Sequence, residues 1–549
     1  MERSFNTTGP CFADEHYMLP PERRLGRVLD LLRHNKYFVL HAGRQTGKTT
    51  SLMWLESFLP TQGKRALRLD LQTARDNPDP ATALRTVFNR LALALEVPHD
   101  GLRAPDPAQV TEWLTDPASA LLHYLRFLAA QDPRPFVLLL DEADCLAGDT
   151  MVTVLTQLRD GYLSRRQIPF PSSIALVGMR SVRDYVVRKE DQRVISWLGT
   201  SSPFNISAES AILSSFTEPE VTELLSQHTT DTGQVFTPEA VSRTWELAEG
   251  HPWLTNALAD QVVRNDVRDR SVPVTRAHID AAKETILLER RSHIDSLVAR
   301  LREPRIARIL SPMLAGERAA ADDVLHDDFA YAVGLGLLQL KDGQYQIANP
   351  IYREVIPRAL TFDQQAQIHE KPLRYVRPDG GLDMAALMAA WQTFWRKDGH
   401  LAAGGFGYRE AGPHLMLMAF LQRILYAGAK SSALWAGDAG TSSARPSAEG
   451  ARENTHGGGR IEREYGLGRG ALDLMVFWKN ERHAIEVKLR RDTETEVEAL
   501  DQVTDYLDHA GLDEGWLVLF DLRKDLSWAD KLTTREATRP GKRVHVVGC

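Results

Sequence analysis

The residues best suited to chemistry begin with Gly43-Arg44-Gln45-Thr46-Gly47-Lys48-Thr49-Thr50, which follow an apolar run at 37–40. A buried strand, a glycine-containing turn and a helix starting at Gly-Lys-Thr form the arrangement of a phosphate-binding loop. Its backbone N–H groups and the helix N-terminus attract phosphate. All eight residues are predicted to contact ATP, with Lys48 neutralising the β- and γ-phosphates and Thr49 holding Mg²⁺. Ala42 stands where the full pattern has glycine, so we predict a variant loop; an ordinary glycine turn is the alternative.

A second apolar run, at 136–140, ends in Asp141 and Glu142. A buried parallel strand delivers such carboxylates to the carboxyl edge of its sheet, where ligands bind. Asp141 is predicted to bind the Mg²⁺ shell, and Glu142 is predicted to be catalytic by polarising the attacking water. An acidic cap on the following helix is the alternative interpretation.

A further strand is predicted at 173–178, directly before Met179 and Arg180. In the inferred fold the end of this strand lies beside the γ-phosphate, so Arg180 is a candidate nucleotide sensor. Arg183 is its rival. Either arginine could instead be a solvated residue at the start of a helix.

Helical spacing replaces the strand pattern from about residue 206. Thr217 and Glu220 have the spacing of a capping box, and Gly250-His251-Pro252-Trp253 begins another predicted helix. With the two nucleotide motifs and Ser-Pro-Phe-Asn at 202–205, this segment resembles the AAA-like or archaeal-type ATPases of the STAND group. In that group a Gly-x-Pro of the helical lid contacts the nucleotide, which implies this role for Pro252. A proline at the first position of a helix is the alternative.

Residues 295–360 predict a winged helix, because three short helices precede a hairpin with an Asp342-Gly343 turn. The recognition helix of a sequence-specific reader is basic, whereas the segment at 327–334 is apolar and acidic. We therefore favour docking within this chain or to another protein over DNA reading.

A second chemical centre is predicted on a hairpin that carries Asp473 on one strand and Glu486 and Lys488 on the other. Side chains alternate across a strand, so Glu486 and Lys488 share a face. Two carboxylates and an ammonium can hold one or two divalent cations, Mg²⁺ or Mn²⁺, and can orient a water. The lysine is suited to stabilise charge that develops on a phosphodiester.

The helix after this hairpin carries Gln502 and Tyr506, which are four residues apart and share a face. Together with the hairpin, this Gln-x-x-x-Tyr is similar to the RecB-like branch of the PD-(D/E)XK nuclease superfamily. The resemblance implies metal-dependent hydrolysis of DNA, with Gln502 and Tyr506 as catalytic residues beside Asp473, Glu486 and Lys488. It also implies a further metal ligand from the first core helix, with His414 and Glu410 as the candidates. A capping or surface histidine is the alternative for His414, and Glu462 and Glu464 are similarly ambiguous.

Length and composition predict several domains in a chain of 549 residues. We assign a P-loop ATPase core to 1–205, a helical lid to 206–294, a winged helix to 295–360 and a linker to 361–381. An α/β nuclease-like domain follows at 382–549, with a flexible insertion at 428–459. The predicted fold class is therefore α/β: a parallel P-loop sheet with lid and winged helix, and a separate α/β domain of PD-(D/E)XK type.

Charge and cysteine content restrict the partners and the compartment. The net charge of −7 gives no overall basic field, so any phosphate-binding surface must be local. Such a surface, or merely a solvated charged face, is predicted near the hairpin by Arg460, Arg463, Arg469, Lys488, Arg490 and Arg491. Three cysteines without metal spacing favour the reducing cytoplasm, and no apolar stretch predicts a membrane span.

The leading hypothesis is an ATP-regulated, metal-dependent nuclease that acts on DNA. The resemblances also imply a role in microbial defence, and a homo-oligomer because AAA-type sites often take an arginine from a neighbouring subunit. One alternative is a nucleotide-switched signalling or assembly ATPase whose C-terminal domain binds nucleic acid or a partner without cleaving it. A winged-helix transcription regulator is a third.

Overall fold

The structure is a computed structural model. It describes residues 2–96, 101–146, 148–178, 186–187, 196–197, 209–288, 297, 300–301, 303–314, 319–320, 327–341, 343–360, 375–399, 412–426, 459–467, 470–490, 494–521, 523 and 526–549. The chain divides into two units. The first comprises Met1–Leu288, Ala321–Lys341 and Ile347–Pro350, and the second comprises Glu289–Ala320, Asp342–Gln346 and Ile351–Cys549.

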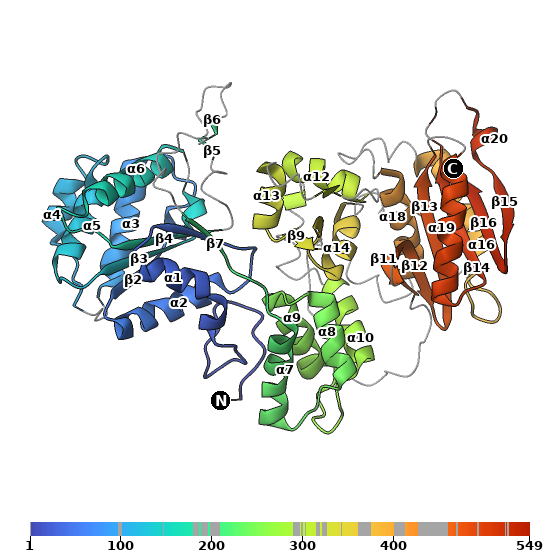
Figure 1. The fold of residues 1–549 in the computed structure, drawn as a ribbon, viewed down its shortest axis with the longest axis horizontal. Coiled ribbons are helices and arrows are strands. Elements are labelled where there is room, and N and C mark those ends of the chain that lie inside the picture. The colour runs from blue at the N-terminus through green and yellow to red at the C-terminus, as the bar shows by residue number, and fades with distance from the viewer. Residues whose placement is uncertain are drawn as a thin grey trace, which may run out of the picture. The chain divides into compact units, whose positions relative to one another are not determined.

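A five-stranded parallel sheet forms the centre of the first unit (Figure 1). Its strands have the order β2-β3-β4-β1-β7, and all four pairings are parallel. Strands β1, β3 and β4 are buried along their whole length, as expected for a parallel sheet with both faces covered. The five strands are β1 (Phe38–His41), β2 (Arg65–Asp70), β3 (Phe136–Asp141), β4 (Ser173–Gly178) and β7 (Glu209–Ile212).

Side chains alternate along these strands, so apolar residues point to both faces of the sheet, and helices cover both faces. Leu138 and Leu140 of β3 pack against α3 (Pro80–Ala94), α5 (Ala120–Ala130) and α6 (Gly148–Ser164). Val137 and Leu139 point to the opposite face, which α1 (Gly26–Arg33) and α2 (Lys48–Phe58) cover. Helix α4 (Pro107–Trp113) and the 3-10 turns Pro21–Arg24, Leu59–Gln62, Gln72–Ala74 and Ala143–Cys145 complete this part of the unit.

A group of helices follows the sheet, as the sequence predicts: α7 (Glu218–Thr232), α8 (Pro238–Ala248), α9 (Pro252–Gln261) and α10 (Arg276–Leu288). The predicted capping box is confirmed, because Thr217 and Glu220 bond to each other's backbone N–H. Gly250 has a φ of 72°, and a Cβ placed there would lie 1.9 Å from the Phe216 carbonyl oxygen. Only glycine fits at this position, because the backbone of Phe216 passes so close to it.

The winged-helix segment is shared between the two units. The first unit contains α13 (Asp327–Gly334) and β9 (Leu338–Lys341), and the second contains α12 (Pro304–Leu314) and β8 (Ala319–Ala320). Strands β8 and β10 (Gln344–Ile347) pair antiparallel, and α14 (Pro350–Leu360) follows. The helix expected near 322–325 lies outside the described residues, so the winged helix stays a prediction.

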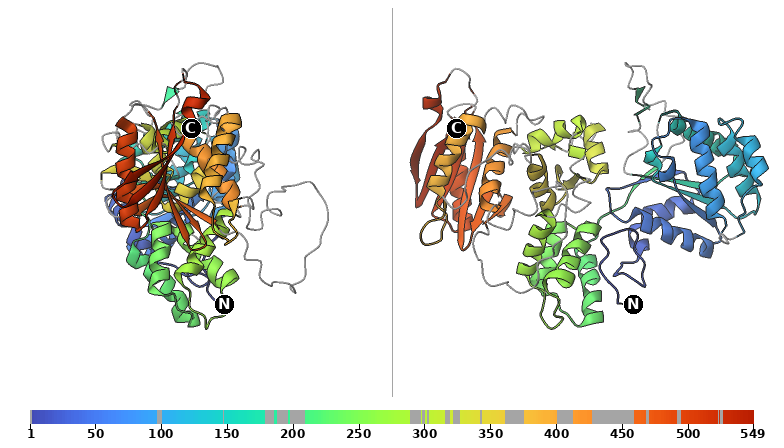
Figure 2. Two further views of the ribbon diagram at one scale, coloured as in Figure 1. Left: turned by 90° about the vertical axis from the view of Figure 1, so that its right-hand side faces the viewer. Right: turned by 180° about the vertical axis from the view of Figure 1, so that it is seen from behind.

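A six-stranded sheet of order β11-β12-β13-β14-β16-β15 organises the second unit. Helix α19 (Glu494–Ala510) packs on one face of the sheet, and α16 (Met384–Phe394) lies on the other (Figure 2). The Trp391 ring of α16 contacts the Phe520 ring of the sheet, with centroids 6.0 Å apart. The predicted hairpin is confirmed, since β12 pairs antiparallel with β13. The strands are β11 (Gly459–Leu467), β12 (Gly470–Trp478), β13 (Glu481–Leu489), β14 (Glu514–Phe520), β15 (Thr534–Arg539) and β16 (Lys542–Gly548), and the further helices are α18 (Gly412–Tyr426) and α20 (Trp528–Lys531).

Within the described residues, no helix combines the length and the apolar character that crossing a bilayer requires.

A buried arginine connects the central sheet to α5. The Arg65 guanidinium donates hydrogen bonds to the carbonyl oxygens of Leu128 at 3.0 Å, Ala129 at 2.9 Å and Asp132 at 2.7 Å. The last carbonyls of a helix have no partner within it and carry partial negative charge. Arg65 therefore satisfies the carboxyl end of α5 with a cation that is itself wholly buried.

We expect Arg65→Met to lower the free energy of unfolding by about 3 kcal/mol, because several buried carbonyls lose their donor. Thermal unfolding followed by circular dichroism measures the loss. Arg90→Met, at an exposed position of α3, is the matched control and should change stability by less than about 0.5 kcal/mol. Equal effects of the two substitutions would contradict this role for Arg65.

Candidate functional site

The loop between β1 and α2 has the backbone shape that its sequence predicts. Gly47 caps α2 with a φ of 89°, and Gln45 has a φ of 57°. The Thr46 hydroxyl donates to the Gly43 carbonyl at 2.8 Å, which closes the turn. Lys48 begins α2, with its ammonium beneath the loop.

Lys48 is a buried cation held by backbone oxygens. Its side chain donates to the carbonyls of Ala42 at 3.0 Å and Gly43 at 2.8 Å, and the residue is 8% exposed. Burial lowers the pKa of Lys48, and the nearby Glu142 carboxylate offsets part of this lowering. A buried ammonium bonded to neutral carbonyls favours an incoming anion, so this loop fits the phosphates of a nucleotide.

The two nucleotide motifs meet directly. The Thr49 hydroxyl donates to Asp141 Oδ2 at 2.9 Å. Burial raises the pKa of Asp141. A hydroxyl and a carboxylate at this separation suit the oxygen preference of Mg²⁺, so the pair fits the cation that the sequence predicts.

Glu142 stands just beyond β3 in the left-handed region, with a φ of 52°. Burial raises the pKa of its carboxyl, and the neighbouring Asp144 adds to the effect. Arg75 Nη2 lies 3.8 Å from Glu142 Oε2. No sequence motif points to Arg75, because it belongs to an irregular connection.

The lid and the N-terminal segment before α1 also reach the loop. Arg24 donates to the Thr46 carbonyl at 2.9 Å and to the Ser214 carbonyl at 2.7 Å. His251 caps α9 by accepting a bond from the Leu254 N–H at 3.4 Å, and its ring bonds the Arg44 backbone. Burial lowers the pKa of His251 to about 4, so a neutral imidazole joins lid and loop.

The remaining predictions for this site have different outcomes. Pro252 is the first residue of α9 and is buried. The Thr50 hydroxyl accepts a hydrogen bond from the Cys11 N–H at 3.1 Å. A Cβ added to Gly43 would lie 3.0 Å from the Leu335 carbonyl, so the segment after α13 also approaches the loop. Arg180, Arg183 and the 202–205 segment lie outside the described residues.

The hairpin of the second unit brings its predicted residues together. The Asp473 N–H donates to Glu486 Oε2 at 3.4 Å, and the Asp473 carboxylate accepts from the Val487 N–H at 2.9 Å. Lys488 Nζ lies 2.8 Å from Glu486 Oε1, which confirms that these two side chains share a face. The arrangement is two adjacent carboxylates with one ammonium beside them.

The Glu486 carboxyl is buried in this cluster. Burial, and then the Asp473 carboxylate, raise its pKa to about 8. Burial lowers the pKa of Lys488, but the Glu486 and Asp473 charges more than offset this, so its net shift is upward. A divalent cation would stabilise the ionised form of Glu486, so the cluster fits such an ion once this proton leaves.

Helix α19 covers the cluster with Gln502 and Tyr506, whose side chains bond to each other at 2.6 Å. Burial raises the pKa of Tyr506, as do the Glu486 and Asp473 charges to a smaller extent. On α18, His414 is buried, and its ring stacks on that of Phe520 with an interplanar angle of 29° and centroids 6.4 Å apart. His414 as a metal ligand stays a prediction.

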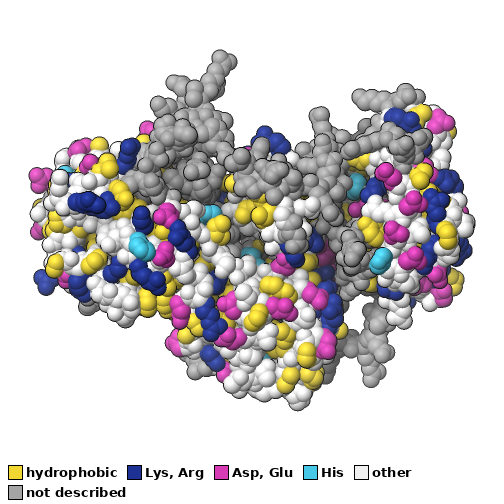
Figure 3. All heavy atoms as spheres, in the orientation of Figure 1, with side chains coloured by type: hydrophobic (Ala, Val, Ile, Leu, Met, Phe, Trp, Pro, Cys, Tyr) yellow, Lys and Arg dark blue, Asp and Glu magenta, His cyan; other side chains and the backbone are white. Residues whose placement is uncertain are grey.

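The surface around this sheet mixes both signs of charge. Basic and acidic side chains are interspersed over the second unit in the face that Figure 3 shows. Acids of α19 pair with basic residues of neighbouring strands, as Asp501 does with Arg539 at 3.3 Å and Asp508 with Lys542 at 3.0 Å. The side chains of Arg460, Arg463, Glu462 and Glu464, and all of Glu410, Arg469 and Arg491, lie outside the described part.

We expect the buried Glu486 carboxyl to make stability fall with rising pH. Because its folded pKa is raised, its contribution is complete below its unfolded pKa of 4.5 and is lost as pH rises to about 8. In EDTA, the Tm of Glu486→Gln relative to wild type should therefore increase between pH 6 and pH 9, by at least about 2 °C. Glu498→Gln, on an exposed position of α19, should show no such trend. A flat difference for Glu486→Gln would contradict the raised pKa.

One family model matches more than half of this chain, and several solved structures resemble part of it. The family model described as an AAA-like domain matches residues 27–356, which is more than half of the chain. A Walker-type ATPase of Pyrococcus abyssi has a similar structure, with a TM-score of 0.44 and 16% identity over 64% of this chain and 99% of that chain. The Thermotoga maritima RuvB Holliday junction branch migration motor gives 0.30 and 12% over 60% and 90%. A search of curated protein sequences finds no match. The hydrogen bond between Thr49 and Asp141, which joins the two nucleotide motifs, agrees with the match to the AAA-like domain. The family match shows that the chain belongs to the AAA-like domain family of P-loop ATPases.

Proposed function

We propose that this chain is an ATP-regulated, metal-dependent nuclease that hydrolyses DNA phosphodiesters. The observation that carries the nuclease part is the convergence of Asp473, Glu486 and Lys488 on one hairpin. A buried carboxyl with a raised pKa beside a second carboxylate and an ammonium is typical of a functional site. The placement of Gln502 and Tyr506 over the cluster supports the same proposal.

At the first site, Gly43 to Thr50 and Lys48 in particular would hold the nucleotide phosphates, and Thr49 and Asp141 would hold Mg²⁺. Glu142 would orient the attacking water, with Arg75 close enough to modulate its charge. Arg180 remains our candidate sensor, supported by the position of β4 between β1 and β3 in the sheet. Pro252 remains a proposed nucleotide contact because it directly follows His251, whose ring bonds the loop.

At the second site, Asp473 and Glu486 would hold a Mg²⁺ or Mn²⁺ ion, with His414 as a proposed further ligand. Bound there, the cation would activate a water and neutralise charge on the phosphate. The Lys488 ammonium, which the Glu486 carboxylate holds at this site, would contact the phosphodiester oxygens. Glu486 must release its proton before it binds a cation, so the site should load better at alkaline pH.

The second candidate is a nucleotide-switched signalling or assembly ATPase whose C-terminal domain binds nucleic acid or a partner without cleaving it. One observation favours it: among the residues that the structure describes, no group of three or more His, Cys, Asp or Glu side chains is arranged to hold a metal ion. Cleavage assays separate the two candidates. A homo-oligomer that shares an arginine between subunits is compatible with either.

The first test is cleavage of plasmid, linear duplex and single-stranded DNA with Mg²⁺ or Mn²⁺, with and without ATP. Lys488→Ala should reduce the rate at least about 100-fold, because it removes the ammonium beside the phosphate. Lys397→Ala, on the exposed surface of the same unit, should cleave like wild type. ATP hydrolysis without cleavage of any substrate would favour the signalling candidate.

Nucleotide binding gives a separate prediction. Lys48→Ala should weaken ATP binding by at least about tenfold, since the loop loses its buried cation. Fluorescent ATP-analogue titration measures this, with the exposed Lys36→Ala as control. Unchanged affinity in Lys48→Ala would contradict the loop as the nucleotide site.

A further inference from the structure

A pocket of about 420 Å³ lies in the first unit between the N-terminal segment and the lid. Its volume is within the range of small-molecule sites. None of its lining residues belongs to the P-loop or to the Asp-Glu motif. Four arginines line it against a single carboxylate, Glu2: they are Arg3, Arg264, Arg268 and Arg270.

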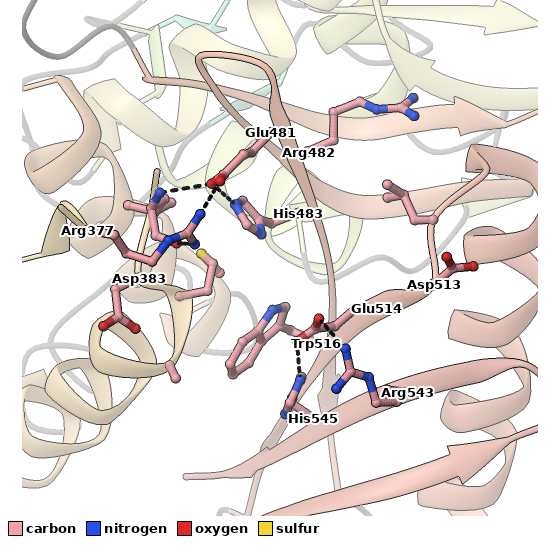
Figure 4. Close-up of a pocket in the computed structure, with 14 residues that line it drawn as sticks. Arg377, Asp383, Glu481, Arg482, His483, Asp513, Glu514, Trp516, Arg543 and His545 are labelled. Atoms are coloured by element: carbon pink, nitrogen blue, oxygen red, sulfur yellow. Dashed lines mark hydrogen bonds and ion pairs between the residues drawn. The ribbon is translucent and has the colours of Figure 1, made fainter. Parts of the chain in front are cut away.

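A pocket of the second unit provides a contrast (Figure 4). It has about 450 Å³, and four carboxylates line it beside three arginines. Glu481 points between Arg377 and His483, and Glu514 pairs with both Arg543 and His545. Its charges are satisfied internally, so it has no preference for an anion. The lid pocket lacks this balance.

Arg270 is the preorganised member of the lid pocket. Its Nη1 lies 3.1 Å from Gln234 Oε1 and 3.2 Å from His228 Nε2, and these two residues are 0% and 1% exposed. The other edge of the guanidinium donates to Glu2 Oε1 at 3.2 Å, and the Glu2 side chain is 68% exposed. Buried groups thus fix Arg270, while an exposed carboxylate occupies the position that a ligand anion would take.

The other arginines differ in how strongly they are committed. Arg3 holds Asp231 with two bonds of 2.9 Å and is a structural tie. Arg264 reaches Asp260 only at 3.4 Å, and its side chain is 62% exposed. Arg268 is exposed and has no hydrogen-bond or ion-pair partner among the described residues. Arg268 and Arg264 are therefore available to an anion held by Arg270.

We propose that this pocket binds a small phosphate-bearing molecule, whose phosphate displaces Glu2 from Arg270 and is shared with Arg268. The planar guanidinium fork matches phosphate oxygens in pairs. Phe5 and Tyr17 below the pocket are 2% and 1% exposed, so no ring is offered for a base to stack on. Recognition rests on the phosphate. The proposal is independent of the nuclease hypothesis.

The test uses full-length Lys48→Ala protein, so that the P-loop does not compete, and isothermal titration with pyrophosphate. We expect binding that weakens at least about tenfold when Arg268→Gln is added. Glu2→Gln should instead tighten it, because the competing carboxylate is removed. A merely structural Glu2–Arg270 tie predicts no such gain. Arg33→Gln, an exposed arginine of α1, is the matched control and should leave binding unchanged.

Three outcomes would overturn the proposal: no pyrophosphate binding to the Lys48→Ala protein, equal binding after Arg268→Gln, or binding of a single-stranded oligonucleotide without binding of pyrophosphate. The last would indicate a nucleic-acid surface. Because Arg268 is exposed and makes no hydrogen bond to the buried Gln234 and His228, its substitution tests the pocket without disturbing the lid. An unchanged Tm for Arg268→Gln verifies this.

Discussion

The hydrogen bond from the Thr49 hydroxyl to the Asp141 carboxylate joins two segments that are 92 residues apart. It forms because β4 alone separates β1 from β3, so the carboxyl ends of all three strands meet at one edge. The register fixes this: β1 and β3 both pair in parallel with β4. The loop, the acidic motif and the lid contacts depend on this alignment.

Both chemical centres keep an ionisable group where water is scarce. Lys48 lies under backbone carbonyls, and Glu486 lies beside a second carboxylate. In each case burial disfavours the charged form, so an incoming ion of opposite charge is stabilised by more than its direct contacts. The two centres are electrostatic opposites: the first buries an ammonium, and the second buries a carboxyl beside another carboxylate.

The sequence was informative where a pattern is local. Glycines, the buried runs and the alternation of Glu486 with Lys488 predicted the loop, the central strands and the hairpin. Strands β7 and β15, each at the edge of its sheet, were missed: β7 has only four residues, and most side chains of β15 are exposed and polar, as in a loop. Hence the core sheet extends past the boundary expected at residue 205. Arg24 and Arg75 were missed for another reason, since their partners are fixed only by tertiary packing.

The N-terminal segment sets a length limit on motion. The Cys11 N–H is bonded to Thr50 at the nucleotide loop, and the Thr7 carbonyl accepts a bond from the Trp253 indole in the lid. Four residues of chain extend to about 14 Å at most. While both hydrogen bonds are intact, the lid and the loop can move apart only as far as this stretch of chain reaches. A wider opening must break one of two identified bonds, so the segment acts as a mechanical stop.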